Sequence, residues 1–205
     1  MNERIYLLPR WIRLWHWTNA VLIIALGVTG FGLHFASPAY ELVEFSLAVR
    51  IHNIAGLALT GMFFFFVIAN AVSGNWRQYV PKSPGILHRC WLQTRYYCWG
   101  VFKGEPEPFP VTREVNFNAL QSLIYWLIMY VVLPANIVTG LLYLTPQFSP
   151  PRIFGFDGHL TVAMLHYLSA AIILLFAIAH IYLGSMGAKV TSMYKTMITG
   201  WHEHE

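Results

Sequence analysis

The stretch HYLSAAIILLFAIAH, from His166 to His180, decides how this chain folds. Between its two histidines it carries no charged residue and almost no polar one. The whole chain has the same character, since 57% of its 205 residues are hydrophobic and 11% are charged. A soluble domain has about 25% charged residues, and a helix that crosses a membrane needs about 20 mainly apolar residues. The composition therefore predicts a membrane protein.

Four segments are long and apolar enough to cross the bilayer. They cover residues 14–35, 51–73, 119–144 and 160–186. We therefore predict an all-α membrane protein, a four-transmembrane-helix bundle that forms a single domain over residues 1–205, with a long loop at residues 74–118. The first apolar segment is longer than the hydrophobic region of a signal peptide, so no cleaved leader is expected.

The basic residues predict the orientation of this bundle. Of the 13 lysine and arginine residues, all but Arg50 and Arg152 lie at the chain ends or in the loop at residues 74–118. Positively charged segments stay in the cytoplasm. Both termini and the long loop are therefore expected to be cytoplasmic, in a multi-pass protein surrounded by lipid in the bacterial inner (cytoplasmic) membrane. The formal net charge of +4 needs no nucleic-acid partner to explain it.

The two cysteines, Cys90 and Cys98, lie in the predicted cytoplasmic loop, where thiols stay reduced. No C-x-x-C-H motif is present, which excludes covalent c-type haem attachment. Two cysteines are also too few for a four-cysteine iron–sulfur cluster. Any redox group of this chain must therefore depend on other side chains.

Of the nine histidines, three lie in the loop or the tail and two, His34 and His159, fall near the outer interface, which leaves four in or near the spans. His16 is near the cytoplasmic end of the first span, and His52 is near the outer end of the second. His166 is near the outer end of the fourth span, and His180 lies about 21 Å deeper at 1.5 Å per residue, on nearly the same helix face. The histidines therefore form an outer level (His52 and His166) and an inner level (His16 and His180).

Two levels of paired histidines favour two b-type haems. Haem iron takes axial side chains, and cofactor sites in helix bundles are built by side chains from facing helices. We expect His52 and His166 to hold an outer haem, and His16 and His180 an inner one. The residue four positions after each histidine is small and would leave room for the flat ring; these residues are Ala20, Gly56, Ala170 and Gly184. Gly30 is expected to give room to the outer haem where it passes the first span.

Other interpretations of these residues stay open. A histidine in a membrane helix can be a hydrogen-bonded packing residue, and small residues also mark ordinary helix contacts. Intramembrane histidines could instead relay protons or bind a metal ion in a transporter. His34 and His159, at the outer interface, are interpreted as interface residues. A b-type absorbance spectrum would separate a cytochrome from a transporter.

Three motifs, RLWHWTNA in the first span, RIHNIAG in the second and MLHYLSAAIILLFAIAHIYLG in the fourth, carry a family resemblance. The chain resembles the di-haem cytochrome b subunits of the formate dehydrogenase gamma and thiosulfate reductase cytochrome b group over nearly its whole length. The resemblance implies the same haem pairing, with His52 and His166 at the outer haem and His16 and His180 at the inner one.

The resemblance also implies a quinone site beside the inner haem, at the start of the third span. The formate dehydrogenase pattern there is Asn-x-Gly-Gln-Lys. In the stretch NFNALQS, Asn118 and Gln121 match this pattern, whereas Leu120 and Ser122 replace its glycine and lysine. The alternative role for Asn118 is that of a helix N-cap. Asn116 is a competing quinone contact, and Tyr182 is a weaker candidate.

The resemblance further implies the partners of this chain. The short outer loops leave no room for a substrate-oxidising domain, so a separate subunit on the periplasmic side, an iron–sulfur protein or a multihaem cytochrome c, is expected. Electrons would pass between that subunit and the membrane pool of menaquinone or ubiquinone. The alternative is a free-standing cytochrome b561-like quinone oxidoreductase.

Overall fold

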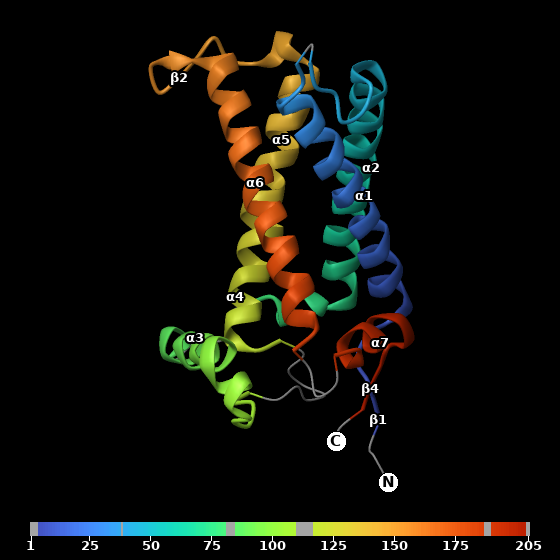
Figure 1. The fold of residues 1–205 in the computed structure, drawn as a ribbon, viewed down its shortest axis with the longest axis vertical. Coiled ribbons are helices and arrows are strands. Elements are labelled where there is room, and N and C mark those ends of the chain that lie inside the picture. The colour runs from blue at the N-terminus through green and yellow to red at the C-terminus, as the bar shows by residue number, and fades with distance from the viewer. Residues whose placement is uncertain (1–3, 38, 81–84, 110–116, 187–189, 204–205) are drawn as a thin grey trace. The chain divides into compact units, whose positions relative to one another are not determined.

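The computed structural model describes residues 4–37, 39–80, 85–109, 117–186 and 190–203. Four of its helical segments are long and apolar enough to span a membrane. They are α1 (Arg10–His34), α2 (Phe45–Ser73), the segment Ala119–Leu144 and α6 (Gly158–Gly184), which Figure 1 shows as long coiled ribbons. The predicted all-α fold with four membrane-spanning helices is confirmed.

The third spanning segment is not a uniform α-helix. It consists of α4 (Ala119–Leu127), the π-helical segment η4 (Ile128–Val132) and α5 (Leu133–Leu144). Pro134 lies in the first turn of α5. A proline has no backbone N–H and its ring crowds the preceding turn, so the regular hydrogen-bond ladder shifts just before it. The sequence analysis predicted the length of this span and missed its interruption.

Acidic side chains fix where two of the spans begin. α2 begins at Phe45, before the predicted residue 51, because the Glu44 carboxylate accepts hydrogen bonds from the backbone N–H groups of Ser46 (2.9 Å) and Leu47 (2.8 Å). These hydrogen bonds lower the pKa of the Glu44 carboxyl, and the bond from the Ser46 backbone has the largest effect. Asp157 Oδ1 similarly accepts from the backbone N–H of Leu160 (2.9 Å) at the start of α6. Both carboxylates satisfy donors that a helix start leaves without a partner.

The chain divides into two compact units. The helical unit comprises Leu14–Ile68 and Val132–Ile178, and the terminal unit comprises Met1–Arg13, Ala69–Val131 and Ala179–Glu205. The organisation of residues 1–205 as a single domain stays a prediction.

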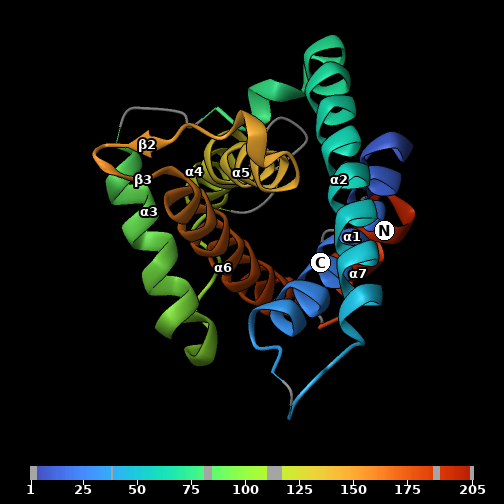
Figure 2. The ribbon, with the colours of Figure 1, turned by 90° about the horizontal axis from the view of Figure 1, so that it is seen from above.

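Within the helical unit, α1 lies beside α2 and α5 beside α6, as Figure 2 shows along the helices. Trp15 Nε1 donates to the carbonyl oxygen of Met62 at 3.1 Å, and this joins α1 to α2. Asn136 Nδ2 donates to Ser169 Oγ at 3.0 Å, and this joins α5 to α6. Polar side chains thus connect neighbouring spans whose remaining surfaces are mostly apolar.

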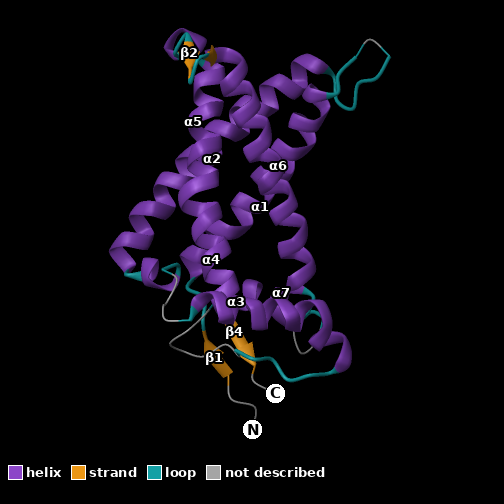
Figure 3. Cartoon of the chain, turned by 90° about the vertical axis from the view of Figure 1, so that its left-hand side faces the viewer, coloured by secondary structure: helices purple, strands orange, loops and turns teal. Residues whose placement is uncertain are grey.

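A short hairpin leads into α6 in the helical unit. Strands β2 (Arg152–Ile153) and β3 (Phe156–Asp157) pair antiparallel, and they are among the few strands in the mostly helical cartoon of Figure 3. Both residues of the connecting loop have positive φ, 50° at Phe154 and 86° at Gly155, as a two-residue hairpin with the twist of its strands requires. The helix that follows carries the fourth span.

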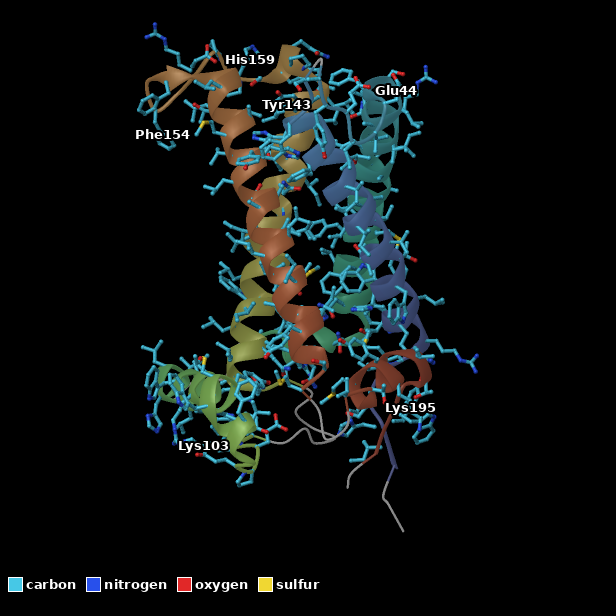
Figure 4. The ribbon with its side chains drawn as sticks, viewed as in Figure 1. Glu44, Lys103, Tyr143, Phe154, His159 and Lys195 are labelled. Carbon is cyan, nitrogen blue, oxygen red and sulfur yellow. The ribbon has the colours of Figure 1, made fainter. Side chains whose placement is uncertain are left out.

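In the terminal unit, the two ends of the described chain pair as strands. β1 (Arg4–Tyr6) and β4 (Trp201–Glu203) are antiparallel, and α7 (Ser192–Thr199) precedes β4. The loop predicted at residues 74–118 contains short helical elements; these are η1 (Asn75–Gln78), α3 (Ile86–Arg95), η2 (Tyr96–Gly100) and η3 (Val101–Lys103). Figure 4 labels Lys103 in η3 and Lys195 in α7. The sequence analysis predicted none of these elements.

Candidate functional site

The outer pair of histidines meets inside the helical unit. His52 on α2 and His166 on α6 are both half-buried, and their ring centroids are 6.3 Å apart with planes at 76°. An imidazole nitrogen lies about 2 Å from a first-row metal that it binds, so two imidazoles on opposite sides of one iron have ring centroids about 6 Å apart. The two rings therefore have the separation that a shared haem iron requires.

The His52 ring is held in one tautomer. Its Nδ1 is 3.0 Å from the hydroxyl oxygen of Thr29 on α1. That hydroxyl donates its own proton to the carbonyl oxygen of Ala25 at 2.7 Å, so it accepts from His52. We infer that Nδ1 carries the proton, which leaves the lone pair of Nε2 for a metal, in the arrangement that ligating histidines usually have.

The His166 ring has a similar environment on α5. Its Nδ1 is 3.2 Å from the Asn136 carbonyl oxygen and 3.2 Å from the Thr139 hydroxyl. The Thr139 proton goes to the carbonyl oxygen of Ala135 at 2.7 Å, so both oxygens act as acceptors. The Asn136 side-chain amide also lies 3.4 Å from Nδ1, but its two N–H groups donate at shorter distances to the His166 carbonyl oxygen and to Ser169 Oγ. His166 Nδ1 therefore carries a proton, and Nε2 again keeps its lone pair.

Two glycines make room for these imidazoles. A Cβ added at Gly30 on α1 would lie 3.2 Å from His52 Cε1, and one added at Gly140 on α5 would lie 3.0 Å from His166 Cε1. The predicted role of Gly30 was room for the haem; in the structure its neighbour is the His52 ring itself. The ring of Tyr143, which Figure 4 labels, is roughly parallel to that of His166 at 6.4 Å between centroids.

The other predicted clearance residues have different surroundings. Gly56 has only a methyl carbon of Leu26 within 4.0 Å, so the space beside it is nearly open. Gly184, in the terminal unit, faces the ring of Tyr194 at 3.5 Å. Ala20 and Ala170 are partly exposed in the structure. A role of these residues beside a haem stays a prediction.

The two inner histidines belong to different units. His180, in the terminal unit, has its Nδ1 3.3 Å from the Tyr125 hydroxyl of α4. His16, in the helical unit, lies edge-on to the ring of Trp17 at 5.3 Å between centroids. That these two histidines bind one iron stays a prediction from their depth in the sequence.

Both predicted quinone residues have a structural role at the start of α4. Asn118 is the N-cap, because its Oδ1 accepts from the Gln121 backbone N–H at 2.9 Å. Gln121 Oε1 accepts in return from the Asn118 backbone N–H at 3.0 Å, which completes a capping box. Asn118 Nδ2 also donates to the Tyr97 hydroxyl at 3.1 Å. A quinone contact would be additional and stays a prediction; Asn116 lies outside the described residues.

Three further aromatic or histidine candidates are at the surface of their units. His34 is exposed and stacks on Tyr167, with centroids 4.3 Å apart and planes at 17°. His159, labelled in Figure 4 near the hairpin, is exposed, and so is Tyr182 in the terminal unit. Exposed side chains at these positions are typical of interface residues and not of residues that bind a buried group.

The sequence analysis missed the residues that hold the histidine rings. They are Thr29, Asn136, Thr139 and Tyr125. A signal was present, because Asn136 and Thr139 are polar residues in an apolar span and three positions apart, hence on one helix face. Which histidine they face depends on helix packing, which the spacing alone does not determine.

Four apolar spans and a pair of facing imidazoles with available Nε2 atoms define a membrane protein suited to hold a metal-centred group. Residues 7–200 match the prokaryotic cytochrome b561 family. The Escherichia coli (strain K12) protein named "Putative cytochrome YdhU" is 37% identical over 203 residues, which are 99% of this chain and 76% of that protein. The chain therefore belongs to the prokaryotic cytochrome b561 family.

Membership in this family establishes the class of activity. The chain is a membrane cytochrome that transfers electrons through b-type haem. The alternative of a proton- or metal-relaying transporter has no support from either similarity. The resemblance to the formate dehydrogenase gamma and thiosulfate reductase group is narrower than this family assignment, and its partners and quinone site belong to the proposal below.

Proposed function

We propose that this chain holds two b haems and carries electrons between a partner on the outer side and the membrane quinone pool. The observation that carries the proposal is the 6.3 Å separation of the His52 and His166 rings. In each imidazole the lone pair of Nε2 is available to bind iron, and the two histidines come from different spans. The depth of His16 and His180 in the sequence supports a second, inner haem.

Haem iron supplies reversible one-electron transfer, and the residues of the chain position and insulate it. His52 and His166 would hold the haem iron through Nε2, while Thr29, Asn136 and Thr139 keep the proton on Nδ1. Such hydrogen bonds fix ring orientation and increase the basicity of the ligand. The apolar spans keep water away from the site, so the electron stays on the redox groups.

The quinone site is proposed at the start of α4, beside the inner haem. Asn118 caps the start of α4, and the hydroxyl of Tyr125 on that helix lies 3.3 Å from Nδ1 of His180. One short helix therefore carries both the predicted quinone contact and the neighbour of an inner haem ligand. Asn118 and Gln121 are the proposed contacts, with menaquinone or ubiquinone as the diffusible partner.

The proposed partner on the outer side is an iron–sulfur or multihaem cytochrome c subunit, which makes this chain the membrane anchor of a respiratory complex. Only short segments separate α1 from α2 and α5 from α6. These segments are too short for a substrate-oxidising domain. A free-standing cytochrome b561-like oxidoreductase is the alternative. Purification in mild detergent separates the two, since a redox subunit bound at fixed stoichiometry supports the anchor and its absence supports the free-standing form.

The haem content tests the central proposal. Pyridine haemochrome analysis of the purified full chain should give two b haems per chain, and His166→Ala should leave one. His159→Ala is the matched control, because this exposed histidine near the start of the same helix should leave both haems in place. Two haems retained in His166→Ala would refute the ligand assignment.

A further inference from the structure

Three polar side chains of the terminal unit lead away from Asn118, and the first of them contacts it. They are Gln93 of α3, Tyr97 of η2 and Glu107, and we name them the proton cluster. Tyr97 accepts a hydrogen bond from Asn118 Nδ2 at 3.1 Å. The cluster therefore begins at the proposed quinone contact.

The hydrogen bonds of Asn118 leave Tyr97 as the group that can exchange a proton. The Asn118 amide oxygen is occupied by the capping bond from Gln121. An amide also does not readily gain or lose a proton, whereas a phenol has one proton to donate and lone pairs to accept another. The Tyr97 hydroxyl accepts from Asn118 and keeps its own proton for a different partner.

Gln93 connects Tyr97 to Glu107. Its side chain is fully buried, at 0% exposure, and lies close enough to the Tyr97 hydroxyl and the Glu107 carboxyl to lower the pKa of each. Within the described residues, neither amide atom has a direct hydrogen bond of good geometry. Buried amide groups are usually satisfied by ordered water when protein groups do not reach them. We infer that water beside Gln93 bridges Tyr97 and Glu107.

Glu107 provides a connection to solvent. Its side chain is half-buried. Burial raises the pKa of the carboxyl, and the Gln93 side chain lowers it by less. The groups that face it are the Gln93 amide and the phenols of Tyr96 and Tyr97. The nearby Arg95 guanidinium pairs with Glu105 at 3.1 Å instead. A carboxyl in this position can exchange a proton with the cytoplasm.

We propose that Glu107 receives the protons of a bound quinol through Tyr97 and returns them to cytoplasmic water. The proposal rests on the proposed function, since it concerns the same quinone site. As the quinol O–H bond breaks, its proton joins the Tyr97 oxygen, and the Tyr97 proton moves through the bridging water to the Glu107 carboxylate. The haems that the four histidines would hold would take up the two electrons. A second proton follows after Glu107 has released the first, so one quinol gives one quinone, two protons and two electrons.

Rapid mixing of the oxidised full chain with menadiol, a soluble naphthoquinol, tests this route. Reduction in the wild type should speed up as pH rises through the raised pKa of Glu107, because only the carboxylate accepts a proton. Glu107→Gln should slow haem reduction by about 10²-fold, as loss of a positioned base does, and remove this pH dependence. Glu105→Gln is the matched control in the same segment and should behave as the wild type.

An infrared difference spectrum adds a readout that does not depend on the rate. Menadiol addition should produce the C=O band of a protonated carboxyl in the wild type and in Glu105→Gln, and not in Glu107→Gln. Tyr97→Phe should slow the reaction to a similar extent, and Tyr97→Phe/Glu107→Gln should slow it no further, because both residues serve one route.

The outcomes separate the inference from the proposed function. If menadiol fails to reduce wild-type haem, both are wrong. If menadiol reduces the haem and Glu107→Gln keeps the wild-type rate and pH dependence, only the proton route is wrong. Equal slowing in Glu105→Gln and Glu107→Gln, with the wild-type pH dependence retained, would also overturn it, since the effect would then come from the fold of the segment.

Discussion

At the scale of single residues, His52 and His166 meet because each side chain lies at a similar depth in its span. The rise of a helix and the length of an apolar span fix the depth of a side chain, so His52 and His166 were expected at the same level. The structure brings these two rings together. The hydrogen bonds of Thr29 and Thr139 to the rings depend on how α1 and α5 are rotated about their axes. Packing between helices sets this rotation, which a single sequence does not reveal.

The Thr29 hydroxyl should tune the outer haem. Thr29→Val keeps the side-chain shape and removes the acceptor 3.0 Å from His52 Nδ1. A less basic imidazole stabilises ferric iron less, so the reduction potential should rise. Loss of one neutral hydrogen bond, about 0.5–1.5 kcal/mol, corresponds to about 20–60 mV for one electron. Redox titration of the haem bands measures the shift, and Thr29→Ser should restore the wild-type potential. An unchanged potential in Thr29→Val would contradict the tautomer assignment.

The glycines beside the rings should be essential for haem binding. Gly140→Ala would place a Cβ 3.0 Å from His166 Cε1, which is too close for the present ring position. The outer haem should be lost, leaving one b haem per chain by pyridine haemochrome analysis. Gly61→Ala is the control, because among the described residues no atom outside its own stretch of helix backbone lies within 4 Å of its added Cβ. Alanine favours a helix by about 1 kcal/mol over glycine, so weakened helix formation cannot explain a loss. Equal haem content in the two variants would show that Gly140 does not position His166.

At the scale of elements, apolar length predicts the four spans well and their ends less well. α2 begins at Phe45 instead of residue 51, because the Glu44 carboxylate caps the helix there. A prediction from hydrophobicity does not take such a cap into account. The amphipathic helix α3 and the strand pair β1–β4 also escaped prediction. Their short segments carry no long periodic pattern, and their stability depends on contacts within the terminal unit rather than on local sequence.

Gly158 should be required for the transition from the hairpin to α6. A Cβ at this position would lie 1.7 Å from the carbonyl oxygen of Pro150, and a backbone atom cannot easily move away. Gly158→Ala should therefore cost at least the roughly 1–3 kcal/mol typical of overpacking. A lower midpoint of thermal haem loss in detergent would reveal it. His159→Ala, at the exposed neighbouring position, should leave the midpoint unchanged. A wild-type midpoint in Gly158→Ala would mean that the hairpin can move aside without cost.

At the scale of the whole molecule, composition was sufficient to predict a membrane protein, and four apolar helices and the family match confirm it. The pairing of the two inner haem ligands, in contrast, stays a prediction. His16 and His180 lie in different units, and only their equal depth along the spans pairs them. The cytoplasmic position of both termini likewise rests on the distribution of basic residues. These two predictions concern the molecule as a whole and need measurements on the complete chain.

Paired substitutions test how the four histidines are shared between two haems. If His16 and His180 bind one iron, His16→Ala/His180→Ala should lose the inner haem and keep the outer one. His16→Ala/His166→Ala removes one ligand from each iron and should leave no haem bound with the wild-type spectrum. Each double variant lacks two histidines, so the general cost of losing imidazoles is matched between them. Haem content and redox titration of the remaining component distinguish the two results.

The same experiment distinguishes the depth argument from its alternative. If the opposite pattern appeared, with one haem in His16→Ala/His166→Ala and none in His16→Ala/His180→Ala, then His16 and His166 would share an iron. Helix rise places His166 about 21 Å from His180 along α6. If His16 lies at the predicted level of His180, no imidazole spans that distance to His166. The predicted orientation of α1 relative to α6 would then be wrong, and with it the proposed placement of the quinone site at the cytoplasmic side.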